Sequence, residues 1–176
     1  VECIGKGKAA APYEFGVKAS IVTNNRKAPG GLFVLHAKAL PGSPYDGHTL
    51  RDIIERTETE TLTGCSIQRA YVDKGYRGHD VQNPRRVFIS GQRRGVFGII
   101  KRELRRRSAI EPIIGHLKAE VISGDALKGR AGDAANVLLS AVGHNFRRIL
   151  AWLRLLCCLF LTALVAAINP IARQSG

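Results

Sequence analysis

Two acidic residues, Asp73 and Glu111, have surroundings in which phosphate chemistry could take place. Glu111 lies four residues after Arg107 and seven residues before Lys118. In an α-helix, which turns by about 100° per residue, these three positions fall on one face. A carboxylate there could bind a hard metal ion while the two cations meet phosphate groups. The spacing therefore predicts a helix face suited to phosphoryl transfer.

The same stretch also has a purely structural interpretation. Ser108 and Glu111 have the spacing of a capping box, in which the glutamate folds back onto the helix start. Pro112 is favoured in a first helical turn. The neighbouring face is predicted to pack against a core, because its apolar residues repeat at helical spacing: Ile110, Ile113, Ile114 and Leu117. On these residues alone, both interpretations of Glu111 stay open.

Asp73 directly follows a short apolar segment, Ile67 to Val72, that predicts a β-strand. Functional groups often stand at the carboxyl ends of strands in α/β sheets. Two-ion phosphoryl transfer needs carboxylates from separate elements that hold ions about 3.5–4 Å apart, and Mg²⁺ prefers oxygen ligands. Asp is also common in turns, such as one before Lys74 and Gly75. Asp73 and Glu111 are our candidate metal ligands.

The charge of the chain predicts a polyanionic partner. Its 176 residues, enough for one domain with a core, include 27 Lys and Arg against 14 Asp and Glu, a net charge of +13. Seven of the cations lie between Arg93 and Arg107, where Glu103 is the only acid. Such a run predicts contacts with the phosphates of nucleic acid. The alternatives are a solvated helix face and an inert basic surface.

Cysteine and histidine give no sign of a metal centre. The four cysteines have no zinc-site spacing and predict reduced thiols in a cytoplasmic protein, and the five histidines are scattered. The opening residues Val1 to Ile4 lack the features of a signal peptide. Because the sequence contains no Met, we expect it to be a fragment or a processed product.

The predicted order of elements along the chain is strand, strand, helix, strand, strand, helix, helix. Two strands joined by a short connection should pair antiparallel, and a helix capped by Asp46 or Thr49 should end by Gly64. A further short strand lies in basic surroundings. The predicted strands are Tyr13 to Val22, Leu32 to Leu40, Ile67 to Val72 and Val87 to Ser90.

Two more helices are predicted in the C-terminal part, Ala134 to Leu153 and Leu155 to Ile168. The first has an apolar stripe that we expect to be buried: Leu138, Val142, Phe146, Ile149 and Leu153. The second is apolar except for Thr162, and we expect it to be buried or to face a partner and to end at Pro170. It is shorter than the roughly 18–20 residues needed to span a bilayer, so no stable membrane association is expected.

Asp73-Lys74-Gly75-Tyr76, followed by Arg107, Glu111 and Lys118, resembles the DDE transposases of bacterial insertion sequences. The resemblance is strongest to the large group that includes insertion sequences numbered four and five. In that group, Asp-x-Gly-Tyr marks the second catalytic aspartate, and a Tyr, Arg, Glu, Lys signature surrounds the catalytic glutamate. Leu104 stands at the tyrosine position, a departure that concerns a contact with substrate DNA rather than the metal site. Further similar stretches are Lys8 to Val17, Pro44 to Leu50, Ser90 to Gln92 and Gly143 to Asn145.

The resemblance implies an α/β fold over residues 1–153, namely an RNase H-like mixed sheet flanked by helices, with an apolar helical tail over residues 154–176. It also implies metal-dependent DNA strand cleavage and strand transfer at insertion-sequence ends. Asp73 and Glu111 would be catalytic ligands of two Mg²⁺ or Mn²⁺ ions. The partners would be transposon ends and target DNA, with a homodimer in the transposition complex, in a bacterial cytoplasm at the nucleoid. The implied DNA-binding residues are Arg107, Lys118, Tyr76, Arg105 and Arg106.

One part of the family pattern is missing. The first catalytic aspartate belongs on the first strand of the sheet, upstream of Lys8, and residues 1–12 contain no aspartate. We therefore expect an inactive C-terminal portion, incomplete at its N-terminus, with an unpaired sheet edge beside Tyr13 to Val22 or Ile67 to Val72. Asp46 is the first candidate for a replacement ligand. The alternatives are a basic nucleic-acid-binding module without catalysis and a membrane-associated protein.

Overall fold

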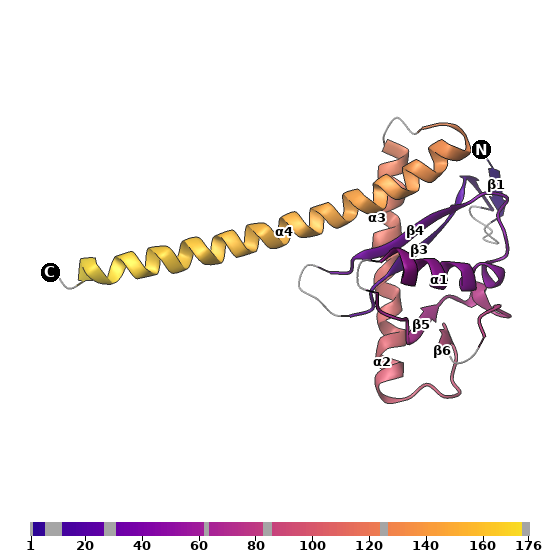
Figure 1. The fold of residues 1–176 in the computed structure, drawn as a ribbon, viewed down its shortest axis with the longest axis horizontal. Coiled ribbons are helices and arrows are strands. Elements are labelled where there is room, and N and C mark those ends of the chain that lie inside the picture. The colour runs from indigo at the N-terminus through magenta and orange to yellow at the C-terminus, as the bar shows by residue number, and fades with distance from the viewer. Residues whose placement is uncertain are drawn as a thin grey trace.

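The computed structural model describes residues 2–5, 12–26, 31–61, 64–82, 86–123 and 127–173. Short strands dominate the first half of the described chain and helices the second, and one long helix extends away from the packed part of the chain (Figure 1). The α/β composition predicted from the sequence is thus confirmed. The elements are β1 (Glu2–Gly5), β2 (Tyr13–Gly16), β3 (Lys18–Thr23), β4 (Val34–Leu40), η1 (Asp46–His48), α1 (Leu50–Glu60), β5 (Arg69–Val72), η2 (Lys74–Tyr76), β6 (Arg86–Ile89), α2 (Gly98–Arg106), η3 (Arg107–Ala109), α3 (Ile110–Ser123) and α4 (Gly129–Arg173).

The described strands form three two-stranded sheets rather than one mixed sheet. β1 pairs with β2 and β3 with β4, both antiparallel, whereas β5 and β6 are parallel. The strand predicted over Tyr13 to Val22 is divided, because Gly16 has φ 149°, a conformation that other residues rarely adopt. Within the described part, every strand pairs on one side only, so the unpaired edge expected beside Tyr13 to Val22 or Ile67 to Val72 stays a prediction.

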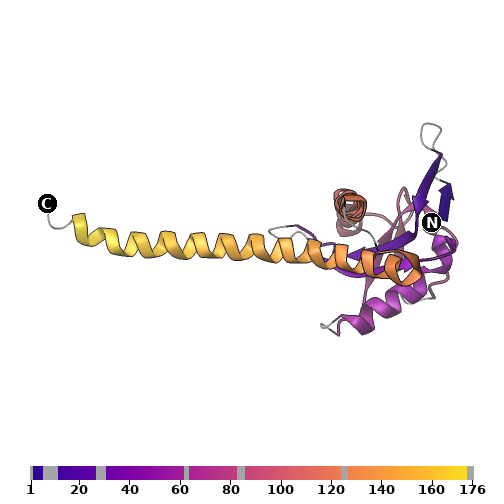
Figure 2. The ribbon, with the colours of Figure 1, turned by 90° about the horizontal axis from the view of Figure 1, so that it is seen from above.

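Helices cover both faces of the β3–β4 hairpin. α1 lies on one side, where Leu50, Ile53 and Ile54 are buried, and α3 lies on the other (Figure 2). Two polar contacts join β4 to α1: an ion pair between the Lys38 ammonium and Asp52, and a contact of 3.0 Å between His36 Nδ1 and Glu60. The core on the α3 side brings together Val34, Ile113, Leu117 and Ala141, with Ile21, Leu32 and Ala37 around them.

α2, η3 and α3 follow one another as a single helical column (Figure 1). Ile113 and Leu117 are buried, as their spacing predicted. The capping-box interpretation of Ser108 and Glu111 is wrong, because the Ser108 hydroxyl donates to the Arg105 carbonyl and Glu111 contacts Arg107. The turn before α3 already supplies hydrogen-bond acceptors for a backbone amide at the helix start, because the Ile110 amide donates to the carbonyls of Arg107 and Ser108.

The buried face of α4 differs from the predicted stripe. Every residue of that stripe is exposed, whereas Ala141 and His144 are buried. The helix instead uses polar groups that reach the backbone of the hairpin. Asn145 accepts from the Val34 amide at 2.9 Å and donates to the Val34 carbonyl at 2.8 Å, and His144 Nε2 lies 3.2 Å from the Leu32 carbonyl oxygen. These hydrogen bonds select the face that docks.

The second half of α4 projects from the packed part without interruption at residue 153 (Figure 1). The expectation that Leu155 to Ile168 is buried is wrong within this chain, since every side chain there is exposed. Pro170 does not end the helix, which continues to Arg173. A proline within a helix removes one backbone hydrogen bond and crowds the carbonyl four residues earlier, yet the helix continues for three residues past Pro170. By length and composition, this helix could cross a membrane.

Candidate functional site

Asp73 stands at the carboxyl end of β5, as predicted. The strand is fixed by its parallel partner β6, and the Ser90 amide donates to the Val72 carbonyl at 2.9 Å. One carboxylate oxygen of Asp73 accepts from the Lys74 amide at 2.7 Å and so caps η2. The second oxygen is turned toward Arg107, with Nη1 at 4.0 Å. Asp73 therefore caps the turn that follows it and still has an exposed carboxylate oxygen.

Glu111 reaches the same guanidinium from the first turn of α3. Its carboxylate lies 3.5 Å from Nη2 of Arg107. The two contacts of 4.0 and 3.5 Å, joined by one planar guanidinium, place the carboxyl oxygens within about 10 Å of each other. Both carboxylates are well exposed, whereas the Arg107 side chain is only 18% exposed. The structure thus brings together the three residues at the centre of the prediction.

Tyr76 faces the interior rather than the solvent. Its hydroxyl lies near the side chain of Ser20, a buried residue of β3. Burial raises the pKa of Tyr76, and the negative charges of Asp46 and Asp73 raise it further. In this structure Tyr76 therefore ties the turn after Asp73 to the hairpin.

Asp46 lies against the same turn. A Cβ atom on Gly75 would stand 2.5 Å from a carboxylate oxygen of Asp46, so a larger residue there would require the Asp46 side chain to move. The carboxylate is paired with Lys18 Nζ at 2.7 Å, and the same ammonium donates to the Pro44 carbonyl. The candidate replacement ligand is therefore engaged in a salt bridge.

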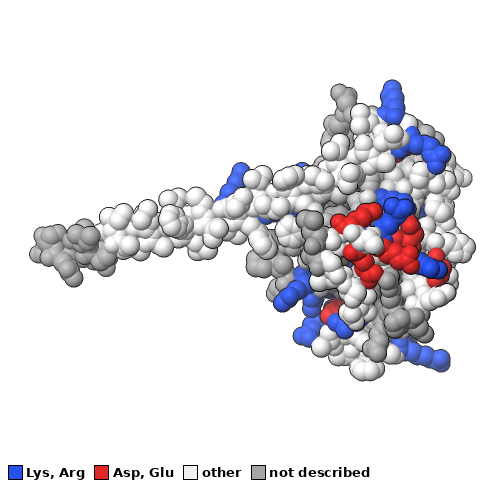
Figure 3. All heavy atoms as spheres, in the orientation of Figure 1, with Lys and Arg blue, Asp and Glu red and all other residues white. Residues whose placement is uncertain are grey.

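The predicted phosphate-binding cations have different surroundings. Arg105 and Lys118 are exposed, and Lys118 lies about 10 Å along α3 from Glu111, given the helical rise. Arg106 is half-buried, and its Nη1 donates to the Asn25 carbonyl at 3.0 Å, so part of its guanidinium holds the β3–β4 loop. Acidic side chains gather over α1 (Figure 3), which contains Asp52, Glu55, Glu58 and Glu60.

A second polar cluster, which the sequence did not reveal, fixes α2 against β5. Glu103 accepts from Arg69 Nε at 3.0 Å and from the Tyr71 hydroxyl, and Tyr71 stacks on Phe88 of β6. Burial works to raise the pKa of Glu103, but the hydrogen bonds from Tyr71 and Arg69 outweigh it and lower that pKa. Burial, followed by the hydrogen bond to Glu103, raises the pKa of Tyr71 to about 12.

This cluster, named here the Glu103 cluster (Arg69, Tyr71 and Glu103), positions the candidate site. It connects the strand that ends at Asp73 with the helix that leads to Arg107 and Glu111. The only sequence signal for it was the isolated acid in a run of seven cations. Its contacts join residues more than 30 positions apart, and such pairing has no local pattern.

The carboxylates are too few for two metal ions. Two-ion phosphoryl transfer needs ligands that bridge and complete both ions, and Asp73 and Glu111 supply only part of such a set. Among the described residues, no three potential metal ligands gather in one place. Asp73 and Glu111 alone therefore do not make up a two-ion site.

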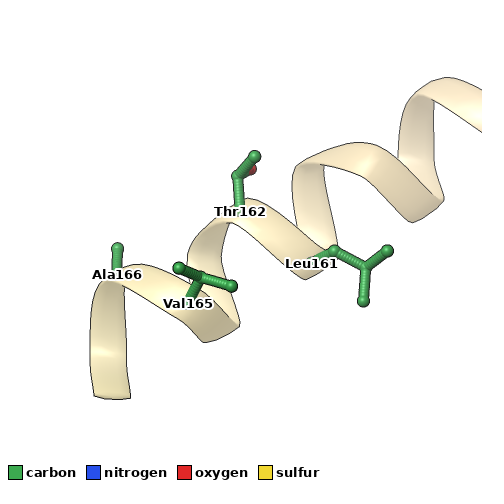
Figure 4. Close-up of a pocket in the computed structure, with 4 residues that line it drawn as sticks. All are labelled: Leu161, Thr162, Val165 and Ala166. Atoms are coloured by element: carbon green, nitrogen blue, oxygen red, sulfur yellow. The ribbon is translucent and has the colours of Figure 1, made fainter. Parts of the chain in front are cut away.

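The surface around the carboxylates is open. A shallow hollow lies elsewhere, on the projecting half of α4, between Leu161, Thr162, Val165 and Ala166 (Figure 4). It is a shallow apolar depression over small side chains on an exposed helix. The candidate site thus suits an extended, charged ligand better than a small apolar molecule.

Comparison with protein-family models, with curated proteins and with solved structures finds no match for this chain. A functional assignment therefore depends on its own residues and on their arrangement.

Proposed function

We propose that this chain is part of a DDE-type transposase, and that Asp73 and Glu111 contribute to metal-dependent cleavage and transfer of DNA strands at insertion-sequence ends. The observation that carries the proposal is the position of Arg107, which contacts both carboxylates at 4.0 and 3.5 Å. The two acids come from a strand end and a helix start that are separated by 37 intervening residues. Their convergence supports a shared role.

The cations around this pair indicate which substrate the proposed site would bind. Phosphate oxygens are recognised well by guanidinium groups, because several N–H donors point in one plane. Arg107 lies between the carboxylates, Arg105 is exposed two residues earlier, and Lys118 is exposed further along the same column. DNA that follows this helical column would place a phosphate next to the carboxylates. The acidic face of α1 would repel DNA and so limits the approach to the other side.

Within this proposal, residues 1–176 bind DNA but do not cut it. The resembling family uses a first aspartate that bridges both ions, and residues 1–12 contain none. Two carboxylates would have to hold two divalent ions against their mutual repulsion, and Mg²⁺ sheds its waters reluctantly. The second candidate function, a basic DNA-binding module without catalysis, is favoured by the same incomplete ligand set. A homodimer and a location at the bacterial nucleoid stay predictions.

Nicking of supercoiled plasmid in Mg²⁺ or Mn²⁺ tests the proposal. Residues 1–176 are compared with a chain extended at its N-terminus by a strand that carries an aspartate. Glu111→Gln is then made in the extended chain, with Glu55→Gln as a matched control, since Glu55 is an exposed acid on α1. We expect nicking by the extended chain and by its Glu55→Gln variant only.

Two results would contradict the proposal in different ways. Nicking that persists in the extended Glu111→Gln variant would show that Glu111 takes no part in strand cleavage. Nicking by residues 1–176 that Glu111→Gln abolishes would overturn the inactivity of this chain. A third ligand would then have to exist, and Asp46 is the first residue to replace.

A further inference from the structure

The projecting half of α4 is apolar on all its sides. From Leu155 to Ile168 every side chain is exposed, and Thr162 is the only polar residue. This part of the helix is free of charge in Figure 3. An ordinary surface helix carries an apolar stripe on one side and polar residues on the other, whereas a helix that is apolar all round is covered on every side. The surrounding medium must therefore be apolar.

The uncharged part of this helix has the length of a bilayer core. Because α4 continues through Pro170 to Arg173, the helical stretch between Arg154 and Arg173 contains eighteen residues without a charge. At the rise of an α-helix, that stretch is about 27 Å long, close to the roughly 30 Å of hydrocarbon in a bilayer. Asn169, its second polar residue, stands within one turn of Arg173, where the stretch ends.

The start of this stretch has the residues that mark a membrane surface. Arg147, Arg148 and Arg154 precede the apolar part. Trp152, which is 42% exposed, contacts Phe33 edge-on, with the ring centroids 5.8 Å apart. Tryptophan is enriched at the boundary between water and lipid, and cations collect on the cytoplasmic side of a span. The packed part therefore ends where a bilayer surface would begin.

We propose that residues 155–172 of α4 insert into a lipid bilayer, with Arg154 and Trp152 at its surface and the packed part of the chain on the cytoplasmic side. The net charge of +13 favours anionic lipids at that surface. The expectation of no membrane association depended on a helix that ended at Pro170, and the structure removes that limit. A second copy of this chain fits less well, since pairing of two helices needs only one apolar seam.

Flotation with vesicles tests this inference on the whole chain. Protein purified in a non-ionic detergent is reconstituted with phosphatidylcholine vesicles, with and without phosphatidylglycerol, and floated after washes with concentrated salt and alkaline carbonate. We expect the protein to stay with the vesicles through both washes. Trp152 is the one tryptophan of the chain, so tryptophan fluorescence reports the depth of this residue in the bilayer. Lipids brominated near the headgroup should quench its fluorescence more than lipids brominated near the chain end.

A charge in the middle of the span supplies the decisive variant. Leu159→Arg should lower the partition into vesicles about 100-fold, given the cost of arginine at the centre of a spanning helix. Leu139→Arg is the matched control, because Leu139 is an equally exposed leucine on the docked part of the same helix, and its partition should not change. The two variants have the same net charge and differ only in position.

Three results would overturn the inference. Release by salt or carbonate would show that the protein only adsorbs to the lipid surface. Flotation of Leu159→Arg at the level of the unchanged protein would show that the span is not inserted. A discrete oligomer that ignores vesicles and is dissociated by Leu159→Arg would show that the apolar helix is covered by further copies of this chain.

Discussion

Replacing Asn145 with alanine should destabilise the packed part of the chain by about 2–4 kcal/mol, because two buried backbone groups would lose their partner. The side-chain amide accepts from the Val34 amide at 2.9 Å and donates to the Val34 carbonyl at 2.8 Å. Val34 is only 6% exposed and belongs to the core formed with α3, so water cannot easily replace these bonds. The change should therefore also loosen the helix that presents Glu111.

Asn136 provides a matched control on the same helix. Its amide makes the same pair of bonds, with the Leu127 amide at 3.2 Å and the Leu127 carbonyl at 3.0 Å, but Leu127 is 53% exposed. Both substitutions gain the same helix propensity, so their difference reports the buried bonds. Asn136→Ala should cost less than about 1 kcal/mol, because water replaces the lost partner.

Urea unfolding in non-ionic detergent measures the two variants side by side. Trp152 fluorescence follows the contact between α4 and Phe33, and circular dichroism follows the helices. We expect a large fall in the urea midpoint for Asn145→Ala and a small one for Asn136→Ala. Equal shifts would refute the reasoning that Asn145 fastens α4 to the edge of β4.

Four further predictions concern the surroundings of the site. Because the pKa of Glu103 is lower in the folded chain, its ionisation adds to the free energy of unfolding at pH values above the usual glutamate pKa of 4.5. This contribution is lost as the pH falls through the pKa that Glu103 has in the folded chain. The raised pKa of Tyr71 adds stability that is present below pH 10 and is lost as pH rises to about 12, so Tyr71→Phe should abolish this alkaline loss in urea midpoints. Lys118→Ala in the extended chain should reduce strand transfer while the Tm stays within a few degrees; a large fall in Tm would make the lysine structural. Arg105→Glu should weaken binding to all DNA sequences about equally and lessen the salt dependence, and a flat salt titration of the unchanged protein would count against phosphate contacts.

Hydrophobic periodicity predicted those parts of the fold in which the buried residues are apolar. Ile113 and Leu117 are in the core because their spacing places them on one side of α3, and the hairpin of β3 and β4 follows from alternation and a short connection. In α4 the same reasoning chose the wrong face. There, docking is decided by hydrogen bonds from His144 and Asn145 to the backbone, and a hydrophobic pattern contains no information about such bonds.

The acidic residues of the candidate site could be predicted from the sequence, whereas the contacts that hold them in place were harder to predict. The spacing of Arg107 and Glu111 placed them together, and the strand end placed Asp73 near them. The contacts of Arg106 with Asn25 and of Tyr76 with Ser20 join distant parts of the chain, so no local signal foretold that these residues serve packing. Similarly, the helix over Leu155 to Ile168 was predicted from the sequence, but the exposure of its side chains was not.

The central claim, that Asp73 and Glu111 share one cation site, is tested most directly by iron-mediated cleavage of the protein backbone. Fe²⁺ replaces Mg²⁺ in the extended chain, and ascorbate with oxygen then generates radicals that cut the chain close to the bound ion. The account predicts cuts near both residue 73 and residue 111, and their joint loss in Asp73→Asn and in Glu111→Gln. Cuts near only one of these positions, or cuts near one that survive removal of the other carboxylate, would contradict it.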